Sequence, residues 1–455
     1  MLTEHNNPYT ISLKVWLIII LLGVLAPGVG LALPFKIINL TENHDQNFAS
    51  HSFNSLGVVG AFQTTPNVQD DFVLIDKSGN ITNLTQSQFS PGTVHSGSIN
   101  DNGQAAILAD GDVYFFDGTS LNNITNGSLA VNSLLGHTLN NSGHIGLSTG
   151  SQLFLYDGTA IVPIPTGDNF ISIESPQLNN RGQIAFLGIT AIPNRADMFL
   201  FTGTTILNLS NDPNLKITDV NGSPSINESG KVLFVANTTT SANNLFLFDG
   251  FTTVNLTTTL GLPAPQPFGA GPVALNNNDQ IAFITNPSAG FNDLWFLENG
   301  QVFKITSQGQ GMGGLYINDN TEIVFSANDT GGTDVFLAIP GETIVIDINP
   351  KQFPNRVNPK SRNIKVAIMS TDSFDATTVD AASVRFGASG LEASSKKSRL
   401  RDLNRDGLPD LLAWFDTRLT GLQCGDTQAR LTGSTIDGHL FDGIDSIVTI
   451  GCRRR

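Results

Sequence analysis

Most of the chain consists of short segments in which apolar and polar positions alternate. Four of them read "DVYFFDG", "QLFLYDG", "DMFLFTG" and "NLFLFDG", and polar turns rich in Asn, Asp and Gly separate them from their neighbours. A period of two predicts β-strands with two unlike faces, and these turn residues supply the backbone conformations that tight hairpins need. The 455 residues include 45 Gly and 21 Pro, which agrees with many turns. We therefore predict an all-β protein built from short strands.

The strands belong to a repeat that one asparagine marks. For example, "INDNGQAAIL" begins at Ile99, "LNNRGQIAFL" at Leu178 and "LNNNDQIAFI" at Leu275. The repeating residues are Asn54, Asn100, Asn140, Asn179, Asn227, Asn276 and Asn318. Their spacings of 46, 40, 39, 48, 49 and 42 residues are typical of the blades of a β-propeller. Each repeat predicts four strands, the first ending at the asparagine and the fourth ending in a sequence such as "NLT".

The two ends of the repeat array predict how it closes. Seven copies of the first three strands can be counted, but a fourth strand follows only six of them. The missing fourth strand stands at the start of the array as "FKIINLT", residues 35–41. We therefore expect a seven-bladed β-propeller over residues 35–340, in which this N-terminal strand completes the last blade and removes the exposed sheet edges. An open array of the same units, or closure with another number of blades, is the alternative.

The repeated polar residues predict structure rather than chemistry. Each repeating asparagine falls at the same turn, so turn geometry explains it without a ligand. An acidic residue also opens the third strand in five repeats, and the same reasoning applies to Asp71, Asp112, Asp197, Asp293 and Asp334. The loops between second and third strands differ, being long in repeats one and four to seven and nearly absent in repeats two and three. We expect a protein or glycan ligand on this uneven loop rim.

A second domain is predicted after residue 341, where the repeat stops. Strand-like runs such as "NIKVAIMST" and "DSIVTIGC" predict a small β-sandwich-like domain over residues 341–455. This part holds 16 of the 24 Lys and Arg and 14 of the 39 Asp and Glu, a net charge of +2, against −17 for the first 341 residues. Cys424 and Cys452, the only two cysteines, are expected to form a disulfide, with two buried free thiols as the alternative.

One loop in this domain has the spacing of a calcium site. The stretch "RDLNRDGLPDLLAWF" places Asp402, Asn404, Asp406 and Asp410 at the first, third, fifth and ninth loop positions. Calcium takes six to eight oxygen ligands, and the carbonyl of Leu408 adds one at the seventh position. An EF-hand would carry Glu where this chain has Ala413, and a strand-like segment follows, so we expect structural calcium rather than a sensor. A plain Asp/Asn turn is the alternative.

Three resemblances extend this interpretation. The loop resembles the D-x-N-x-D-G-x-x-D calcium loops of dockerins, thrombospondin type-3 repeats and FG-GAP/VCBS repeats. Residues 53–340, with "LNNxGQIAF" and "LFLFDG" units, resemble exported bacterial tandem-repeat propellers of the TolB-like or HAF-like kind, although the His-Ala-Phe of the latter is absent. Residues 344–452 resemble a C-terminal domain of secreted bacterial proteins that has no assigned activity. Together these resemblances imply export, calcium and a non-catalytic module.

The N-terminus predicts export. Lys14 precedes an apolar run over residues 15–33 that contains a Pro-Gly break and ends in small residues. This pattern predicts a signal peptide over residues 1–32, with a membrane anchor at residues 15–33 as the alternative. After cleavage we expect no stable membrane insertion, and a location outside the cell, at its surface or in the periplasm. The net charge of −15 argues against nucleic acid as a partner.

Signatures of catalysis are missing from the repeats. Arg181 and Arg195 are the only propeller arginines, too few for the arginine triad of sialidases, and the histidines lack metal-binding spacing. His95, His137 and Asp219 precede first strands and are candidates to approach the central channel. No catalytic residue can be named. We therefore expect a monomeric, non-catalytic binding protein, and keep as the alternative a secreted hydrolase or lyase that acts on polysaccharide through channel carboxylates.

Overall fold

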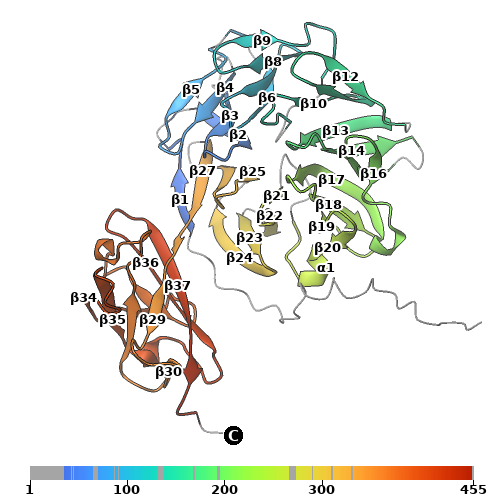
Figure 1. Ribbon diagram of the computed structural model, residues 1–455. Helices are drawn as coiled ribbons and strands as arrows, with labels where there is room; N and C mark the ends of the chain where they lie inside the picture. The colour runs from blue at the N-terminus through green and yellow to red at the C-terminus, as the bar shows by residue number, and fades with distance from the viewer. Residues whose placement is uncertain are drawn as a thin grey trace, which may run out of the picture.

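The computed structural model describes residues 35–452, apart from residues 43, 45, 65–69, 87, 91, 132–137, 168–169, 192–194, 266–272, 289–290, 309–310 and 329–331. The predicted signal peptide, residues 1–32, and its alternative as an anchor lie outside the described residues. Within the described residues, no helix is long and apolar enough to cross a membrane. The chain folds into a β-propeller followed by a second β-rich domain (Figure 1).

Seven of the sheets follow one another in a ring in Figure 1. The first three are β2 (Asn47–Phe53), β3 (Val59–Thr64), β4 (Asp71–Ile75) and β5 (Ile81–Asn83); β6 (Val94–Ile99), β7 (Ala105–Ala109), β8 (Asp112–Phe116) and β9 (Leu121–Asn123); and β10 (Ile145–Thr149), β11 (Gln152–Tyr156) and β12 (Ile161–Ile164). The third sheet was expected to have four strands. Within the described residues its inner position holds only an isolated bridge between Leu139 and Ile145.

The other four sheets each have four strands. They are β13 (Phe170–Leu178), β14 (Ile184–Thr190), β15 (Ala196–Phe201) and β16 (Ile206–Asn208); β17 (Ile217–Ile226), β18 (Val232–Thr238), β19 (Asn244–Phe248) and β20 (Thr253–Asn255); β21 (Val273–Leu275), β22 (Ile281–Ser288), β23 (Phe291–Glu298) and β24 (Gln301–Gln308); and β25 (Gly313–Ile317), β26 (Ile323–Asn328), β27 (Thr333–Pro340) and β1 (Phe35–Asn39). Two short helices, η1 (Pro213–Leu215) and α1 (Leu256–Leu260), lie in the connections.

Apolar side chains fill the space between neighbouring sheets. One cluster joins Met198 of β15 to Val220 and Phe246 of the next sheet, and all three are buried. The rings of Phe234 and Phe246 stack 5.5 Å apart with an interplanar angle of 14°. The phenylalanine stripes of the repeat therefore pack the structure, as their period of two predicts.

The first strand of the array pairs with the last one. β1 runs antiparallel to β27, with Phe35 opposite Pro340 and Asn39 opposite Phe336. A side-chain clasp secures the pair, because Thr41 Oγ1 donates to Asp334 Oδ1 at 2.6 Å and Asn39 Nδ2 donates to Asp334 Oδ2 at 3.1 Å. The two ends of the repeat array are thus joined without a covalent bond.

The same clasp joins third and fourth strands inside the array. Thr125 Oγ1 donates to Asp112 Oδ1 at 2.7 Å, and Asn123 Nδ2 donates to Asp112 Oδ2 at 2.9 Å. Asp71 receives the equivalent bonds from Thr85 and Asn83. The "N-x-T" strand endings and the acid that opens the third strand are therefore two halves of one structural contact. Both residue types repeat for that reason.

The second domain contains two facing sheets and a small third one. The first sheet orders β28 (Glu342–Thr343), β37 (Leu440–Ser446), β36 (Gln428–Ser434), β32 (Arg385–Gly387) and β33 (Ala393–Ser394). The second orders β29 (Ile346–Ile348), β31 (Ile364–Ile368), β35 (Asp410–Phe415) and β34 (Lys397–Arg401). The third pairs β30 (Arg356–Val357) with β38 (Val448–Thr449), and the short helices are η2 (Ala376–Thr378) and η3 (Thr417–Leu419).

One apolar core joins the two facing sheets. Val366 and Phe415 come from the four-stranded sheet, Leu431 and Phe441 come from the five-stranded sheet, and all four are fully buried. The domain is thus a two-layer β-structure. Cys424 and Cys452 form a disulfide with 5.9 Å between their Cα atoms. It ties the segment before β36 to the C-terminal end of the described chain.

The clasp at Asp334 predicts how the array is held closed. Replacing Thr41 with Val keeps the shape of the buried side chain but removes the hydroxyl, so Asp334 loses a donor and the Val335 amide loses an acceptor. We expect Thr41→Val to lower the free energy of unfolding by about 1–3 kcal/mol, measured by urea denaturation. Hydrogen exchange should also increase in β1 and β27.

Thr85→Val provides the matched control, because it removes the same clasp where the strands are covalently connected. We expect a comparable loss of stability there but no increase of exchange in β1. If Thr41→Val left the exchange of β1 and β27 unchanged, the clasp would not be what holds the closure.

Candidate functional site

Seven asparagine side chains form a closed ring of hydrogen bonds where the inner strands end. Each Nδ2 donates to the main-chain carbonyl oxygen of the corresponding asparagine in the next sheet. The N···O distances are 3.1 Å from Asn54 to Asn100, 2.9 Å to Asn140, 3.2 Å to Asn179, 3.0 Å to Asn227, 3.2 Å to Asn276, 2.9 Å to Asn318 and 3.4 Å back to Asn54. The last bond crosses from the final sheet to the first, so the ring is continuous.

The same side chains also shape their own turns. Asn179 Oδ1, for example, accepts the main-chain N–H groups of Arg181 at 3.1 Å and Gln183 at 3.0 Å. The side chain is only 3% exposed. A planar amide offers an acceptor and two donors in one small group, which neither a carboxylate nor a hydroxyl does. The turn role expected from the sequence is therefore only half of what these residues do.

The residue after each ring asparagine lines a hollow at the centre of the ring. Ser55, Asp101, Asn141, Asn180, Glu228, Asn277 and Asp319 take this position, and the hollow has a volume of about 130 Å³. Three of these residues are acidic, and the repeat pattern did not distinguish them. The only sequence feature that marks these acidic residues is small: "IND" or "INE" stands where other repeats have "LNN". The ring geometry brings them together at the opening of this hollow, here called the ring mouth.

Each acidic residue at this mouth accepts a main-chain N–H from the preceding sheet. Asp101 Oδ1 lies 2.8 Å from the amide nitrogen of Ser55, and Glu228 Oε2 lies 3.0 Å from that of Asn180. In other sheets an asparagine side chain accepts the equivalent bond, such as Asn180 from the amide of Asn141 at 2.7 Å. The three carboxylates therefore occupy a structural acceptor position of the repeat.

The mouth is electrostatically negative. Burial raises the pKa of the Glu228 carboxyl, and the charge of Asp319 adds to this, while the amide of Asn180 and the charge of Arg181 oppose it. Such a mouth disfavours anions and suits groups that donate hydrogen bonds.

The other sequence candidates do not gather at this mouth. His95 lies within β6 and is exposed, whereas His137 lies outside the described residues. Asp219 lies within β17 and accepts the amide of Ala196 at 3.3 Å. His95 and Asp219 were expected ahead of first strands, but they are part of them because those strands begin earlier than the pattern suggested.

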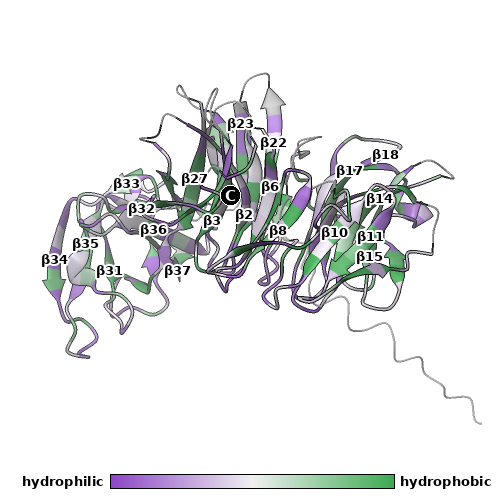
Figure 2. Ribbon diagram, turned by 90° about the horizontal axis from the view of Figure 1, so that it is seen from above, coloured by the Kyte–Doolittle hydropathy of each residue, from purple (hydrophilic) through white to green (hydrophobic). Residues whose placement is uncertain are grey.

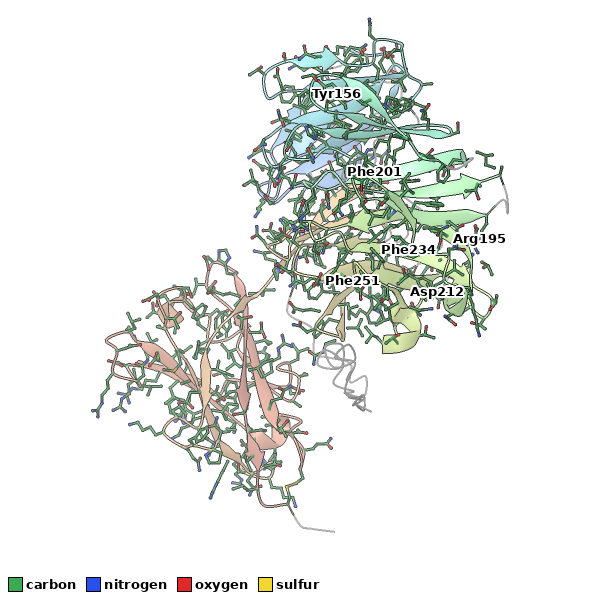
Figure 3. All side chains as sticks on the ribbon, turned by 45° about the vertical axis from the view of Figure 1, so that its right-hand side comes forward. Tyr156, Arg195, Phe201, Asp212, Phe234 and Phe251 are labelled. Carbon is green, nitrogen blue, oxygen red and sulfur yellow. A yellow bond between two sulfur atoms is a disulfide. The ribbon has the colours of Figure 1, made fainter. Side chains whose placement is uncertain are left out.

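Arg195 belongs to the loop rim at the opposite face of the ring. It lies between β14 and β15, toward the edge of the propeller (Figure 3). Its Nη2 contacts Asp197 Oδ1 at 2.6 Å, and its Nη1 donates to the carbonyl of Ile217 at 3.2 Å. This arginine therefore ties the end of a rim loop to the next sheet.

The rim is uneven in its described parts. Only two residues separate β7 from β8 and β10 from β11. The connection between β18 and β19 is longer and folds on itself, with Thr238 Oγ1 accepting the amide of Ser241 at 3.0 Å. The other long loops include residues 65–69, 192–194, 289–290 and 329–331, which lie outside the described residues.

The predicted calcium loop connects β34 to β35 in the second domain. Its side chains bind loop amides: Asp402 Oδ1 accepts from Arg405 at 2.6 Å, and Asp406 Oδ1 accepts from Leu408 at 2.8 Å. Asn404 Nδ2 donates to Asp406 Oδ2 at 2.6 Å. The φ angle of Gly407 is +94°, which a glycine adopts without strain. The spacing therefore produces a tight, self-bonded loop.

Asp410 differs from the rest of the loop because it is fully buried. Its carboxylate accepts the amides of Ser370 at 3.0 Å and Leu403 at 2.8 Å. Three other predicted ligands, Asn404, Asp406 and Leu408, line one hollow with Ser370. In the described part of the chain, no three side chains among His, Cys, Asp and Glu are grouped so that they would hold a metal ion.

Comparisons with known proteins add only general similarity. No protein-family model and no curated protein matches the chain. The solved β-propeller domain of the Trilobed protease from Pyrococcus furiosus shares 11% identity over 64% of this chain and 95% of that one, with a TM-score of 0.44. TolB from Acinetobacter baumannii shares 14% identity over 61% and 77%, with a TM-score of 0.31.

A gluconolactonase from Xanthomonas campestris is similar at the same level. It shares 9% identity over 67% of this chain and 90% of that one, with a TM-score of 0.37. Similarity this weak says nothing about activity or ligand. The propeller is defined instead by its sheets and by the hydrogen bonds between them.

A buried histidine in the first sheet should make the stability of the protein depend on pH. His51 in β2 is 8% exposed, its ring stacks on Phe62 at 5.8 Å, and its Nδ1 has no hydrogen-bond partner among the described residues. Burial lowers its pKa to about 4. The unfolded chain therefore binds a proton below pH 6.5 that the folded chain does not bind until about pH 4. Stability should fall across this window as the pH is lowered.

Between pH 7 and pH 4.5, the free energy of unfolding should fall by about 2–3 kcal/mol less in His51→Phe than in the unmodified protein. Urea denaturation at several pH values measures this difference. The exposed His95, changed to Phe, provides the control and should leave the pH profile unchanged. A His51→Phe profile parallel to that of the unmodified protein would show that burial of this imidazole does not govern the acid response.

Proposed function

We propose that this protein is an exported, non-catalytic binding protein whose seven-bladed propeller closes through β1. The observation that carries the proposal is the use of polar groups at the ring mouth. A hydrolase or lyase needs carboxyl groups that are free to exchange protons with a substrate. Asp101, Glu228 and Asp319 instead accept main-chain amides, as asparagine side chains do at the same position of other repeats. This arrangement supports a scaffold.

The ligand surface in this proposal is the loop rim, and the ligand is a protein or a glycan. Rim loops vary in length while the sheets repeat, which is how propellers commonly acquire specificity. The Cys424–Cys452 disulfide supports an oxidising compartment outside the cytoplasm. A secreted hydrolase or lyase acting on polysaccharide is the second candidate, and the convergence of three acidic residues at one mouth favours it.

Binding and catalysis can be separated with the mature chain that begins at residue 33. We expect it to be retained on an immobilised protein or glycan partner in an array or pull-down screen, with no release of reducing ends or unsaturated sugars from polysaccharides. The Asp101→Asn, Glu228→Gln and Asp319→Asn triple variant should fold normally, because asparagine already fills this position in other sheets. Product formation by the unmodified protein that the triple variant loses would establish the enzyme instead.

We also propose that calcium binds Asp402, Asn404, Asp406, Asp410 and the carbonyl of Leu408. The fully buried carboxylate of Asp410 supports this, because its described contacts are main-chain amides rather than a cation. Burying a carboxylate is costly unless an opposite charge compensates for it. Calcium would supply that charge and would bind the hard oxygen ligands that this loop provides.

In this proposal the ion has a structural role. Asp402 and Asp406 already hold the loop through their amide bonds, and each carboxylate oxygen that accepts one N–H retains a second lone pair for a ligand. Calcium would therefore add to the existing turn rather than replace it. The stabilised element would be the connection between β34 and β35.

Calcium should raise the melting temperature of the mature protein, and EDTA should lower it again. At a calcium concentration 100 times the Kd, the expected stabilisation is about 2.7 kcal/mol. Asp406→Ala should abolish the response. Asp437→Ala, which changes an exposed carboxylate elsewhere in the same domain, should keep it. If neither calcium nor EDTA changed the melting temperature of the unmodified protein, the calcium proposal would be wrong and the loop would be a plain turn.

A further inference from the structure

The exposed face of the four-stranded sheet in the second domain carries a row of basic and aromatic side chains. Trp414 of β35 lies directly opposite Lys397 of β34 on one side and Lys365 of β31 on the other. Directly opposed residues in a sheet point to the same face. The Nζ atom of Lys397 lies 4.8 Å from the centre of the Trp414 ring. A tryptophan therefore stands between two lysines in adjacent strands.

The basic character continues along β34. Lys397, Arg399 and Arg401 follow at intervals of two, so they share one face, and all five residues of the strand are exposed. Within the described residues, these three and Lys365 form no ion pair, whereas Lys396 and Arg418 nearby both pair with Asp416. Asp410, at the far end of the face, is buried and held by amides. Asp347 of β29, directly opposite Ala367, is a second acidic residue on this side of the sheet. With four cations against these two acids, the face carries an excess of positive charge.

The position of this face leaves it open to a partner. β34 lies at the end of the second domain that is furthest from the propeller in both ribbon views (Figures 1 and 2). The other sheet turns toward the propeller, where its buried Arg430–Asp442 pair lines a cleft together with Glu298 and Phe303. One outer face of the domain thus faces the propeller, and within the described residues the other faces away from it.

A role in preventing aggregation does not explain the row. Lysine on an edge strand blocks pairing with another chain, and this accounts for Lys397, Arg399 and Arg401. It does not account for Lys365, because β31 is an inner strand between β29 and β35. Nor does it account for a partly exposed tryptophan between the two lysines.

We propose that this face, defined by Lys365, Lys397, Arg399, Arg401 and Trp414, binds an acidic polysaccharide. Successive cations along β34 lie roughly 7 Å apart, and Lys365 lies two strand spacings, roughly 10 Å, from Lys397. Such spacings suit a linear chain with regularly repeated carboxylate or sulfate groups. The indole ring offers a flat apolar surface to the C–H face of a sugar ring. This site is separate from the propeller rim and does not depend on what the rim binds.

Native affinity electrophoresis of the mature full chain tests the site. We expect gels that contain polygalacturonate or dextran sulfate to retard the protein, and neutral dextran not to retard it, with an effect that weakens as salt is added. Comparing the two anionic gels distinguishes carboxylate from sulfate recognition. The Lys365→Glu and Lys397→Glu double variant should bind at least tenfold more weakly and melt at the same temperature as the unmodified protein.

Lys351→Glu with Lys360→Glu is the matched control, because it makes the same change in net charge at exposed positions off this face. It should bind as the unmodified protein does. If both double variants lost binding to the polyanion equally, the overall charge of the protein would explain the binding, and the proposal would be wrong. Failure to bind either polyanion, or tighter binding of single-stranded DNA at equal ionic strength, would overturn it as well. Ligand capture by the propeller rim should be the same in both variants.

Discussion

The propeller depends on one asparagine side chain in each sheet. Its amide accepts hydrogen bonds from its own turn and donates one to the next sheet. A single side chain therefore stabilises the turn between the first two strands and the contact with the adjacent sheet. Seven such bonds run around the ring. The last one, from Asn318 to Asn54, closes the ring of hydrogen bonds although the polypeptide chain itself is open. A buried amide that lost these partners would leave main-chain groups unpaired. This constraint explains the repetition of asparagine better than a ligand does.

The ring also limits where chemistry can occur. Side chains next to the asparagines accept amides across sheet boundaries, so Asp101 and Glu228 serve in the same way as Asn180. Length varies in the loops at the opposite face, where only two residues separate β7 from β8 but a longer connection joins β18 to β19. The repeat therefore combines an inner mouth, where acidic side chains accept main-chain amides, with a rim whose loops differ in length.

The two outer faces of the second domain have different surroundings. The five-stranded sheet places the buried pair of Arg430 and Asp442 toward the propeller. The four-stranded sheet places lysines and a tryptophan toward solvent. The loop that begins after Arg401 connects the two strands that carry most of this row. An ion that orders the loop would therefore also order the end of the basic face, which links the two proposals for this domain through one hairpin.

The sequence alone determined most strands, the repeat and its end effects, because alternation, turn residues and a missing fourth strand are local patterns. It did not determine where β6 and β17 begin, or that the described part of the third sheet has only three strands. It also indicated the Cys424–Cys452 pair, since no other cysteine was available. Tertiary structure decided the rest. The partner of each ring asparagine lies 39 to 49 residues away, or 264 residues away at the closure. Strand register set Lys365 beside Trp414 and Lys397, and such pairing arises from packing and hydrogen bonds between distant segments that no local pattern encodes.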